Sequence, residues 1–333
     1  TNTRKMHLPG FQAIEGVEVV SVCNRSEASS RKVAEAFGIP KIAHDWGELI
    51  ADPEIDAVCI GTWPYLHAPC TIAALKAGKH VLTEARMAMD LAEAEQMLDA
   101  ARANPELVAQ IVPAPFSLKY DATIQRLLAE GVLGKIREVR VAHFMDASAD
   151  ATAPMNWRQD IRYSGKNTMM LGIHYETVQR WLGVVDPQWV QAGAAIFTQT
   201  RTDAETGDMR PVEIPEALNV TAGYADGSQL VMNLSSVARG MNYLSFRIDG
   251  ERASLRYDIN GNVLYLTEQG QAEHALEPEP GEAGTWNVEA DFVTSIREGS
   301  PVSLTSFAEG VRYMRFTERV WDSWNAARAR LDF

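Results

Sequence analysis

The residues of this chain with the clearest chemical potential are two short polar segments and one histidine. Asn24-Arg25-Ser26 follows an apolar run at 17–23, and Thr62-Trp63-Pro64 follows another at 57–61. In a doubly wound fold, residues directly after a strand lie at the carboxyl edge of the sheet, where ligands bind. His174 carries an imidazole, which titrates near neutral pH and can take the proton of a hydroxyl group.

Arg25 predicts which dinucleotide the first segment would meet. A carboxylate at this strand end would accept a hydrogen bond from the ribose 2′-hydroxyl and favour NAD. An arginine beside a hydroxyl, as in Arg25-Ser26, favours the additional phosphate of NADP. We therefore predict NADP as the cofactor, with NAD as the alternative. The competing interpretation is that Arg25 is a solvated turn residue.

The first third of the chain contains both polar segments and must position them. Its strands and helices alternate. Short apolar runs predict strands at 17–23, 57–61, 80–82 and 108–112. Apolar residues at helical spacing predict helices at 27–37, 66–77, 91–101 and 120–130, with stop signals at Gly38, Pro40 and Gly78. This rhythm predicts an α/β fold with a doubly wound parallel sheet.

After Gly134 the pattern changes to strands in succession. Residues 136–144 alternate polar and apolar side chains, which is typical of a half-buried strand. Further strands are expected at 188–199, 218–224, 229–237, 243–249, 253–258 and 262–267, and helices at 168–182, 286–298 and 307–327. These elements predict a large open, mostly antiparallel sheet. We expect residues 200–215 to form a mobile loop.

Composition excludes several classes of function. The net charge of -13 would repel nucleic-acid phosphates and anionic lipid, so neither is an expected partner. No apolar run approaches membrane-spanning length. The three cysteines are unclustered and sit in or beside apolar runs, which indicates buried free thiols, a reducing compartment such as the cytoplasm, and neither disulfides nor a metal site.

Several segments, in their order and spacing, carry a resemblance to a known family. They are residues 7–11, 60–68, 77–82, 131–136, 157–158, 172–174 and 310–314. Over nearly its whole length the chain resembles the glucose–fructose oxidoreductase / inositol dehydrogenase (Gfo/Idh/MocA) family. The resemblance implies NAD(P)-dependent redox chemistry on a carbohydrate-like small molecule, and a homodimer or homotetramer, since an open sheet would leave an apolar face to cover.

The resemblance also implies a division into two domains. Residues 1–118 would form a dinucleotide-binding Rossmann domain. Residues 119–333 would form an α/β domain for substrate binding and oligomerisation, with the C-terminal helix packing back on the first domain. The family's glycine-rich turn would lie just upstream of Thr1. Because the sequence opens with neither a methionine nor an apolar signal core, we expect the first strand to be missing, and an export signal could have been lost with it.

Two departures from the family pattern affect the chemistry. The family's Glu-Lys-Pro motif falls on Glu84-Ala85-Arg86, so an alanine replaces the lysine that usually contacts the reacting hydroxyl. Without the proline, we expect any cis peptide at this place to be lost, because a non-proline cis bond costs ~3 kcal/mol. In the substrate helix, Met170 stands where the family has an aspartate, which leaves His174 as the surviving polar group.

The candidate site residues follow from these positions. The predicted catalytic residues are His174 as acid/base, with Lys166 and Tyr163 as substitutes for the lost lysine. The predicted cofactor-binding residues are Thr1, Asn2, Thr3, Asn24, Arg25, Ser26, Thr62, Trp63, Pro64, His67, Glu84 and Ala85. The predicted substrate-binding residues are Arg86, Lys119, Trp157, Arg158 and Tyr175. The aromatic members are included because aromatic faces suit a sugar ring.

Five of these side chains also have a purely structural interpretation. His174 could be packed on a helix face, and His67 could anchor the start of its helix. Lys166 and Lys119 could be exposed loop lysines, and Glu84 could cap local backbone groups.

Two other functions remain open from the sequence. One is a lyase or glycosidase that keeps its nicotinamide and oxidises a sugar only transiently. The other is a non-catalytic dinucleotide- or sugar-binding protein, since losing the lysine and aspartate removes polar groups as decay would.

Overall fold

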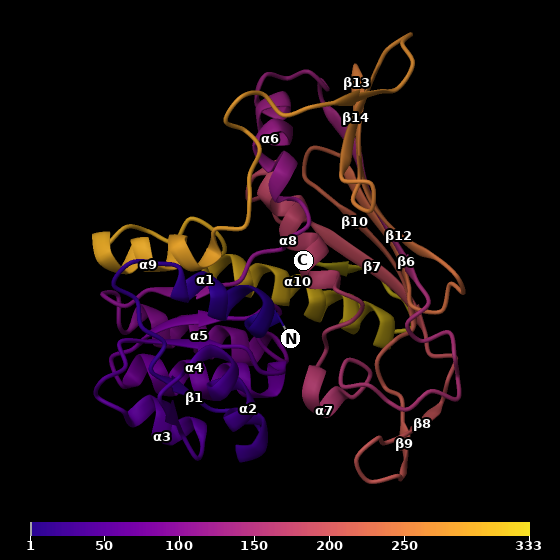
Figure 1. Ribbon diagram of the computed structural model, residues 1–333. Coiled ribbons are helices and arrows are strands. Elements are labelled where there is room, and N and C mark those ends of the chain that lie inside the picture. Colours follow the sequence, from indigo (N-terminus) through magenta and orange to yellow (C-terminus); the bar gives the residue numbers. More distant parts are fainter. Residues whose placement is uncertain (1) are drawn as a thin grey trace. The chain divides into compact units, whose positions relative to one another are not determined.

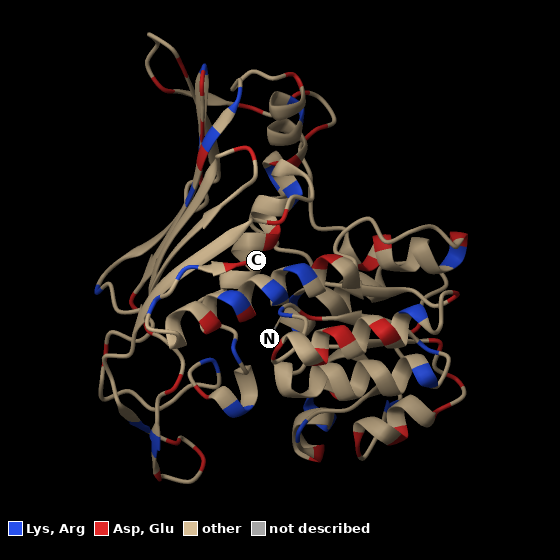
Figure 2. Ribbon diagram, turned by 180° about the vertical axis from the view of Figure 1, so that it is seen from behind, with Lys and Arg blue, Asp and Glu red and all other residues tan. Residues whose placement is uncertain are grey.

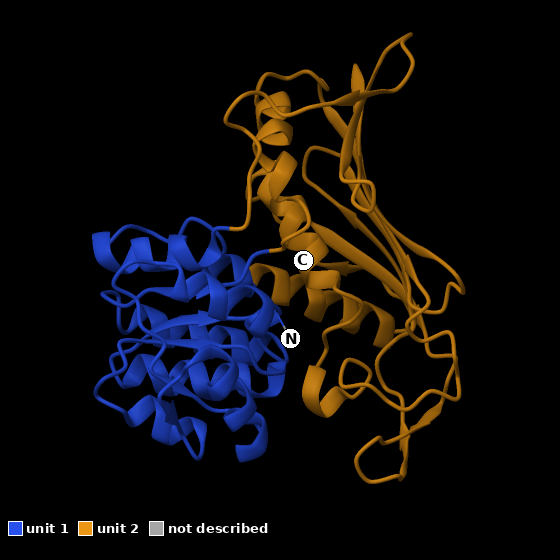
Figure 3. Ribbon diagram, in the orientation of Figure 1, with its two compact units in different colours: residues 1–113, 287–311 blue, residues 114–286, 312–333 orange. Residues whose placement is uncertain are grey.

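The computed structural model describes residues 2–333 and divides the chain into two compact units (Figures 1 and 3). The first unit comprises residues 1–113 and 287–311, and the second comprises residues 114–286 and 312–333. Among the described residues, no helix is long and apolar enough to cross a membrane.

The first unit alternates short strands with helices. Its elements before residue 113 are the π-helical turn η1 (Thr3–His7), α1 (Leu8–Gln12), β1 (Ser21–Val22), α2 (Glu27–Phe37), β2 (Lys41–Ile42), α3 (Trp46–Ala51), β3 (Ala57–Ile60), the 3-10 turn η2 (Pro64–Leu66), α4 (His67–Lys76), β4 (His80–Thr83), α5 (Leu91–Arg102) and β5 (Ala109–Ile111). It also contains α9 (Val288–Glu298), and α10 (Phe307–Asn325) begins in it.

The strands of the first unit are all parallel, as the sequence predicts. β1 pairs with β2, and β3, β4 and β5 form a second sheet in that order. The expected single sheet is therefore present as two parallel pieces. The predicted strand at 17–23 is a ladder only at Ser21 and Val22.

Local sequence signals set the helix ends in this unit. Ser26, Asp45 and Asp90 each cap a helix by accepting a hydrogen bond from the backbone N–H three residues later. Gly38 ends α2 with a φ of +66°, a conformation that glycine adopts without a Cβ clash. The apolar face of α2 then packs with Leu8 and Ile39 in a small core.

Residues from the end of the chain complete the first unit. On α9, Phe292 meets Phe11 of α1 edge to face, with ring centroids 6.3 Å apart. Thr305 exchanges backbone hydrogen bonds with Ile111, at 2.9 and 3.2 Å, which extends the ladder beside β5.

The second unit is built on a nine-stranded sheet. Its elements are the 3-10 turn η3 (Leu118–Tyr120), α6 (Asp121–Ala129), β6 (Ile136–Met145), α7 (Ile161–Ser164), α8 (Leu171–Leu182), β7 (Trp189–Ala195), β8 (Thr200–Thr202), β9 (Met209–Pro211), β10 (Ala217–Gly223), β11 (Gln229–Ser235), β12 (Asn242–Gly250), β13 (Ala253–Asp258), β14 (Val263–Glu268), β15 (His274–Leu276) and β16 (Leu331–Asp332). The order is β15-β14-β13-β12-β6-β11-β10-β7-β16, and only the β6–β11 pair is parallel.

Side chains alternate across this sheet, so that one face is apolar and buried and the other carries a mixture of polar and apolar residues. Val139, Val141 and Phe246 are buried on one face. Many residues on the opposite face are polar. Examples are the Asn219–Asn233 amide pair and the Arg140–Asp249 ion pair. Figure 2 shows charged residues along these strands. Because the strand period is two, the apolar set gathers on a single face.

The expected loop at 200–215 instead contains the antiparallel pair β8–β9. Arg201 in β8 is buried, and its guanidinium donates to Glu216 Oε1 at 3.2 Å and to the Ser148 carbonyl at 2.9 Å. These long-range bonds order the segment.

Gly250 at the end of β12 provides a test of packing in the second unit. A Cβ there would overlap the Leu133 backbone, with its carbonyl carbon only 2.8 Å away. We expect Gly250→Ala to lower the free energy of unfolding by about 2 kcal/mol in urea titrations. The control is Gly193→Ala on β7, where the nearest atom is 3.7 Å away. Equal stability of the two variants would contradict this packing.

Candidate functional site

The carboxyl ends of β3 and β4 are tied together by a buried histidine. His67, the first residue of α4, places Nδ1 2.8 Å from the Arg86 carbonyl oxygen and Nε2 3.2 Å from the Thr62 carbonyl oxygen. Burial lowers the pKa of His67, so the neutral ring donates to one of these carbonyls at a time. This arrangement favours the anchoring interpretation of His67.

The peptide bond between Ala85 and Arg86 is cis, so the expectation that a cis bond would be lost is wrong. That expectation considered only the local preference of a non-proline residue. In the folded unit, Arg86 is buried and its carbonyl oxygen faces His67. Ala85 is partly buried, and its methyl group offers neither a donor nor an acceptor.

The structure brings the two predicted polar segments of the first unit together. The guanidinium of Arg25, which follows β1, lies 5.4 Å from the centre of the Trp63 ring, which follows β3. A cation over an indole face is an attractive arrangement. Thr62 Oγ1 donates to the Trp63 carbonyl at 3.2 Å. The predicted ligand edge thus has an exposed arginine beside an indole ring.

The neighbouring predicted residues have identifiable local roles. Ser26 Oγ accepts from Ser29 N at 3.3 Å as the cap of α2, and the Asn24 backbone N–H donates to Ser30 Oγ at 2.8 Å. Pro64 is buried at the first position of η2.

Glu84, which follows β4, belongs to a buried cluster that the sequence did not predict. His7 places Nε2 3.0 Å from Glu84 Oε1 and Nδ1 2.5 Å from Glu289 Oε1. Asn2 Nδ2 also donates to Glu84 Oε1, at 2.7 Å. His7 is fully buried, so two carboxylates from segments far apart in the sequence enclose one imidazole.

This cluster keeps its histidine charged. Burial disfavours the charged ring, but the hydrogen bonds to Glu289 and Glu84 outweigh it and raise the pKa of His7 to about 9. Burial likewise works to raise the pKa of Glu84, yet the hydrogen bond from His7 produces a net lowering. Glu84 is therefore an ionised carboxylate at neutral pH.

The first residues of the chain meet the same edge of the first unit. Thr3 lies against Gly61, directly after β3, where a Cβ would overlap the Thr3 side chain. Together, Asn2 and Thr3 place the start of the chain beside Glu84 and the end of β3. Thr1, the remaining predicted cofactor residue here, lies outside the described residues.

In the second unit, His174 on α8 is fully buried and pairs with a second histidine. His174 Nε2 lies 2.9 Å from Nδ1 of His143, which lies on β6. The rings of Phe116 and Phe246 each lie 5.7 Å from the His174 ring, centroid to centroid. No described residue forms a hydrogen bond with His174 Nδ1.

Both rings of this pair are neutral. Burial, and then the neighbouring His143, hold the pKa of His174 well below its ordinary value. Burial lowers the pKa of His143 to about 4. Met170, at the position where the resemblance places an aspartate, directly precedes α8 with a φ of +63° and supplies no polar side-chain group.

The other predicted catalytic residues have partners within the second unit. Lys166 forms an ion pair with Glu318 of α10. Tyr163 is partly buried on α7, and the Arg162 guanidinium lies 5.1 Å from its ring centre. Neither contact touches His174.

The predicted substrate residues of this unit divide into two groups. The exposed Arg158 stacks on the Trp157 ring at 4.2 Å, and Lys119 donates to the Tyr120 hydroxyl at 3.0 Å. Tyr175 is fully buried and stacks on Phe316 with ring centroids 3.9 Å apart, which gives it a packing role.

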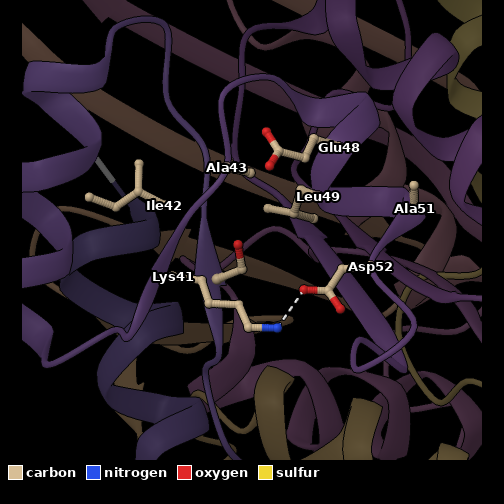
Figure 4. Close-up of a pocket in the computed structure, with 8 residues that line it drawn as sticks. Lys41, Ile42, Ala43, Glu48, Leu49, Ala51 and Asp52 are labelled. Atoms are coloured by element: carbon tan, nitrogen blue, oxygen red, sulfur yellow. Dashed lines mark hydrogen bonds and ion pairs between the residues drawn. The ribbon is translucent and has the colours of Figure 1, made fainter.

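A hollow of about 350 Å³ in the first unit lies apart from all these residues. It is lined by Ser21, Lys41, Ile42, Ala43, Glu48, Leu49, Ala51 and Asp52, and a 2.8 Å ion pair joins Lys41 to Asp52 (Figure 4). None of the predicted site residues lines it.

Cysteines and metal ligands add no further site. Within residues 2–333 no group of three or more His, Cys, Asp or Glu side chains is arranged to hold a metal ion. The three cysteines are free thiols; Cys70 is buried, whereas Cys23 and Cys59 are only partly buried.

Three polar residues of these clusters were missed from the sequence. His7 lies in the segment 7–11 that carried the resemblance, and His143 sits at an inward position of the predicted strand 136–144, so both had a weak signal. Glu289 had none, because its partner lies 282 residues away.

The described residues of the first unit fit the nicotinamide and ribose ends of a dinucleotide. Arg25 is an exposed cation at a strand end. Glu84 is an ionised, partly exposed acceptor whose Oε1 atom is held by His7 and Asn2. Such groups suit a phosphate and a ribose hydroxyl respectively.

Two family models match this chain. Residues 1–111 match the model of the oxidoreductase family with an NAD-binding Rossmann fold, and residues 122–256 match that of the GFO/IDH/MocA C-terminal domain. The chain belongs to the Gfo/Idh/MocA family of oxidoreductases, which confirms the resemblance and the predicted fold class.

Individual relatives are distant. Levoglucosan dehydrogenase of Pseudarthrobacter phenanthrenivorans is 26% identical, covering 90% of this chain and 86% of that protein. A solved structure of levoglucosan dehydrogenase in complex with NADH and L-sorbose superposes with a TM-score of 0.85 at 23% identity, covering 99% of this chain and 94% of that one. An oxidoreductase domain protein from Kribbella flavida gives 0.82 at 25% identity, covering 95% and 90%.

The buried His7 cluster makes stability depend on pH. Because the pKa of His7 rises from 6.5 to about 9 on folding, its contribution is full below 6.5 and is lost as pH rises through 9. We expect His7→Gln to lower the free energy of unfolding by about 3 kcal/mol in mildly acid solution. Urea titrations at several pH values should show the difference from the unmodified protein shrinking towards pH 9. The exposed His44→Gln variant is the control, and a pH-independent difference would contradict a charged His7.

Proposed function

We propose that this protein is an NAD(P)-dependent oxidoreductase that favours NADP and acts on a carbohydrate-like alcohol or its ketone. The observation that carries the proposal is the neutral His174, whose Nδ1 atom is left without a hydrogen bond by the described residues. When its hydrogen is on Nε2, a neutral imidazole presents a free lone pair at Nδ1 and can take the hydroxyl proton, as the base in alcohol oxidation must.

The residues of the first unit would hold the cofactor. When bound, the nicotinamide supplies hydride transfer. Arg25, with Ser26, would bind the phosphate on the adenosine ribose, and Asn24 would border it. Glu84, held as a carboxylate by His7 and Asn2, would accept from a ribose hydroxyl. The remaining predicted cofactor contacts are Thr1, Thr3, Thr62, Trp63, Pro64 and Ala85, whereas His67 would act through the backbone that its ring joins.

Residues of the second unit would hold the substrate. The Trp157 ring with the Arg158 guanidinium offers a flat apolar face beside a hydrogen-bond donor, which suits a sugar ring. Lys119 would add a donor, and Arg86 of the first unit is the other predicted substrate contact. Relatives named levoglucosan dehydrogenase and 1,5-anhydro-D-fructose reductase support a carbohydrate-like substrate.

We also propose a reducing compartment such as the cytoplasm, which the three free thiols support. A homodimer or homotetramer is supported by the stacked Phe144 and Tyr243 rings at the helix-free face of the sheet, and sedimentation velocity would reveal a monomer if this is wrong.

The NADP preference can be tested by nucleotide fluorescence on the full-length protein. We expect Arg25→Ala to weaken NADPH binding by about tenfold or more while changing NADH binding by less than about threefold, because the guanidinium would pair with the additional phosphate. Arg31→Ala on α2, where the exposed Arg31 pairs with Glu27, is the control. Equal effects on both nucleotides would contradict the preference, and no binding of either would contradict the oxidoreductase proposal.

The role of His174 can be tested by turnover with a panel of sugars. We expect His174→Ala to lower kcat/KM by about a hundredfold or more, with the exposed His274→Ala as control. Because the pKa of His174 lies well below 6.5, the oxidation rate should not fall as pH decreases through that value. Turnover with a retained cofactor and no net change in nicotinamide absorbance would instead indicate the lyase. Binding without turnover would indicate a non-catalytic protein.

A further inference from the structure

We propose that His143 is the positioning residue and proton-relay partner of His174, replacing the polar group that this chain lacks at position 170. The inference rests on the proposed function, because it assigns the path by which His174 loses the proton that it accepts. It is carried by the 2.9 Å contact between His143 Nδ1 and His174 Nε2, by the burial of both rings, and by the unpartnered Nδ1 of His174.

The contact couples the tautomers of the two rings. Two imidazole nitrogens at 2.9 Å must share one hydrogen, since two facing lone pairs would repel. If His174 donates from Nε2, its Nδ1 atom is a bare acceptor and His143 carries its own hydrogen on Nε2. If His143 donates from Nδ1, His174 carries its hydrogen on Nδ1. His143 therefore decides whether His174 presents a base or an acid.

Within residues 2–333, no carboxylate acts on either ring as a counter-ion. Phe116 and Phe246 lie against His174, and the electrostatic neighbour that acts on its titration is His143. On the two strands beside β6, the residues in register with His143 are Leu244 of β12 and Leu234 of β11. A positive charge held on this pair would be desolvated and unpaired, so a proton taken from a substrate must pass on.

The relay balances as follows during alcohol oxidation. A hydroxyl proton forms a bond to His174 Nδ1, and the hydrogen on His174 Nε2 moves to His143 Nδ1. The hydrogen on His143 Nε2 then leaves to water, since His143 retains 7% of its surface exposed whereas His174 retains none. One proton enters and one leaves, and each ring ends neutral in its other tautomer. Reduction runs the same path in reverse.

The pair can be tested with two substitutions at one position. His143→Asn keeps a short amide near the place of Nδ1 and can hold the hydrogen bond, but it cannot relay a proton. His143→Phe removes both functions while keeping the apolar packing. His274→Asn, at an exposed histidine on β15, is the control.

The first measurement is the tautomer of His174, read from its ring ¹⁵N shifts by NMR without cofactor. We expect one defined tautomer in the unmodified protein and in His143→Asn, and a change in the His174 shifts in His143→Phe. Unchanged His174 shifts in a folded His143→Phe variant would overturn the proposal. If His143→Phe does not fold, the two-bond ¹H–¹⁵N pattern of both rings in the unmodified protein decides the coupling, and independent tautomers would overturn it.

The second measurement is turnover. We expect both variants to lower kcat by about tenfold or more with KM and NADPH binding little changed, and His143→Asn to enlarge the solvent isotope effect. An unchanged kcat and pH profile in His143→Asn would overturn the relay. If the unmodified protein shows no turnover at all, the proposed function fails, whereas the NMR result still decides whether His143 sets the tautomer of His174.

Discussion

The proposed site depends on the free-energy cost of burying a charged histidine ring away from water. A charged imidazole is stable inside a protein only when anions surround it, and otherwise the ring must be neutral. His7 meets the first condition between Glu84 and Glu289. His174 and His143 meet the second by bonding to each other. The same physical penalty thus produces a fixed charge in one unit and an uncharged pair in the other.

The fixed charge has a structural consequence for the first unit. His7 lies in the N-terminal helical turn, Glu84 follows β4, and Glu289 lies on α9. Each group would destabilise the fold if it were buried alone. The ion pairs among the three groups therefore hold the three segments together. His67 acts similarly with neutral chemistry, because its ring joins the backbone after β3 to the backbone after β4. Two histidines therefore define the edge of the sheet at which the cofactor is proposed to bind.

The loss of two polar family positions is better understood in this context. Ala85 and Met170 remove a lysine and an aspartate from the pattern that the chain otherwise follows. The fold is retained, because family membership and structural similarity extend over nearly the whole chain. In the proposed site, His143 is the partner of His174 and supplies a second neutral ring that can both donate and accept a proton.

Local patterns by themselves determined the elements of this protein. Apolar periodicity and helix caps predict the helices at Glu27–Phe37 and Leu91–Arg102 and the strands from β10 to β14. They also place Arg25 and Trp63 directly after strands. Such signals act between residues a few positions apart, so they can be read from the sequence. The tertiary structure alone decided the His7–Glu289 and His143–His174 pairs, the cis bond at Ala85–Arg86, and the ordering of 200–211 around buried Arg201. Most of these features join residues far apart in the chain. Periodicity carries no information about which distant side chains will pack together in the interior.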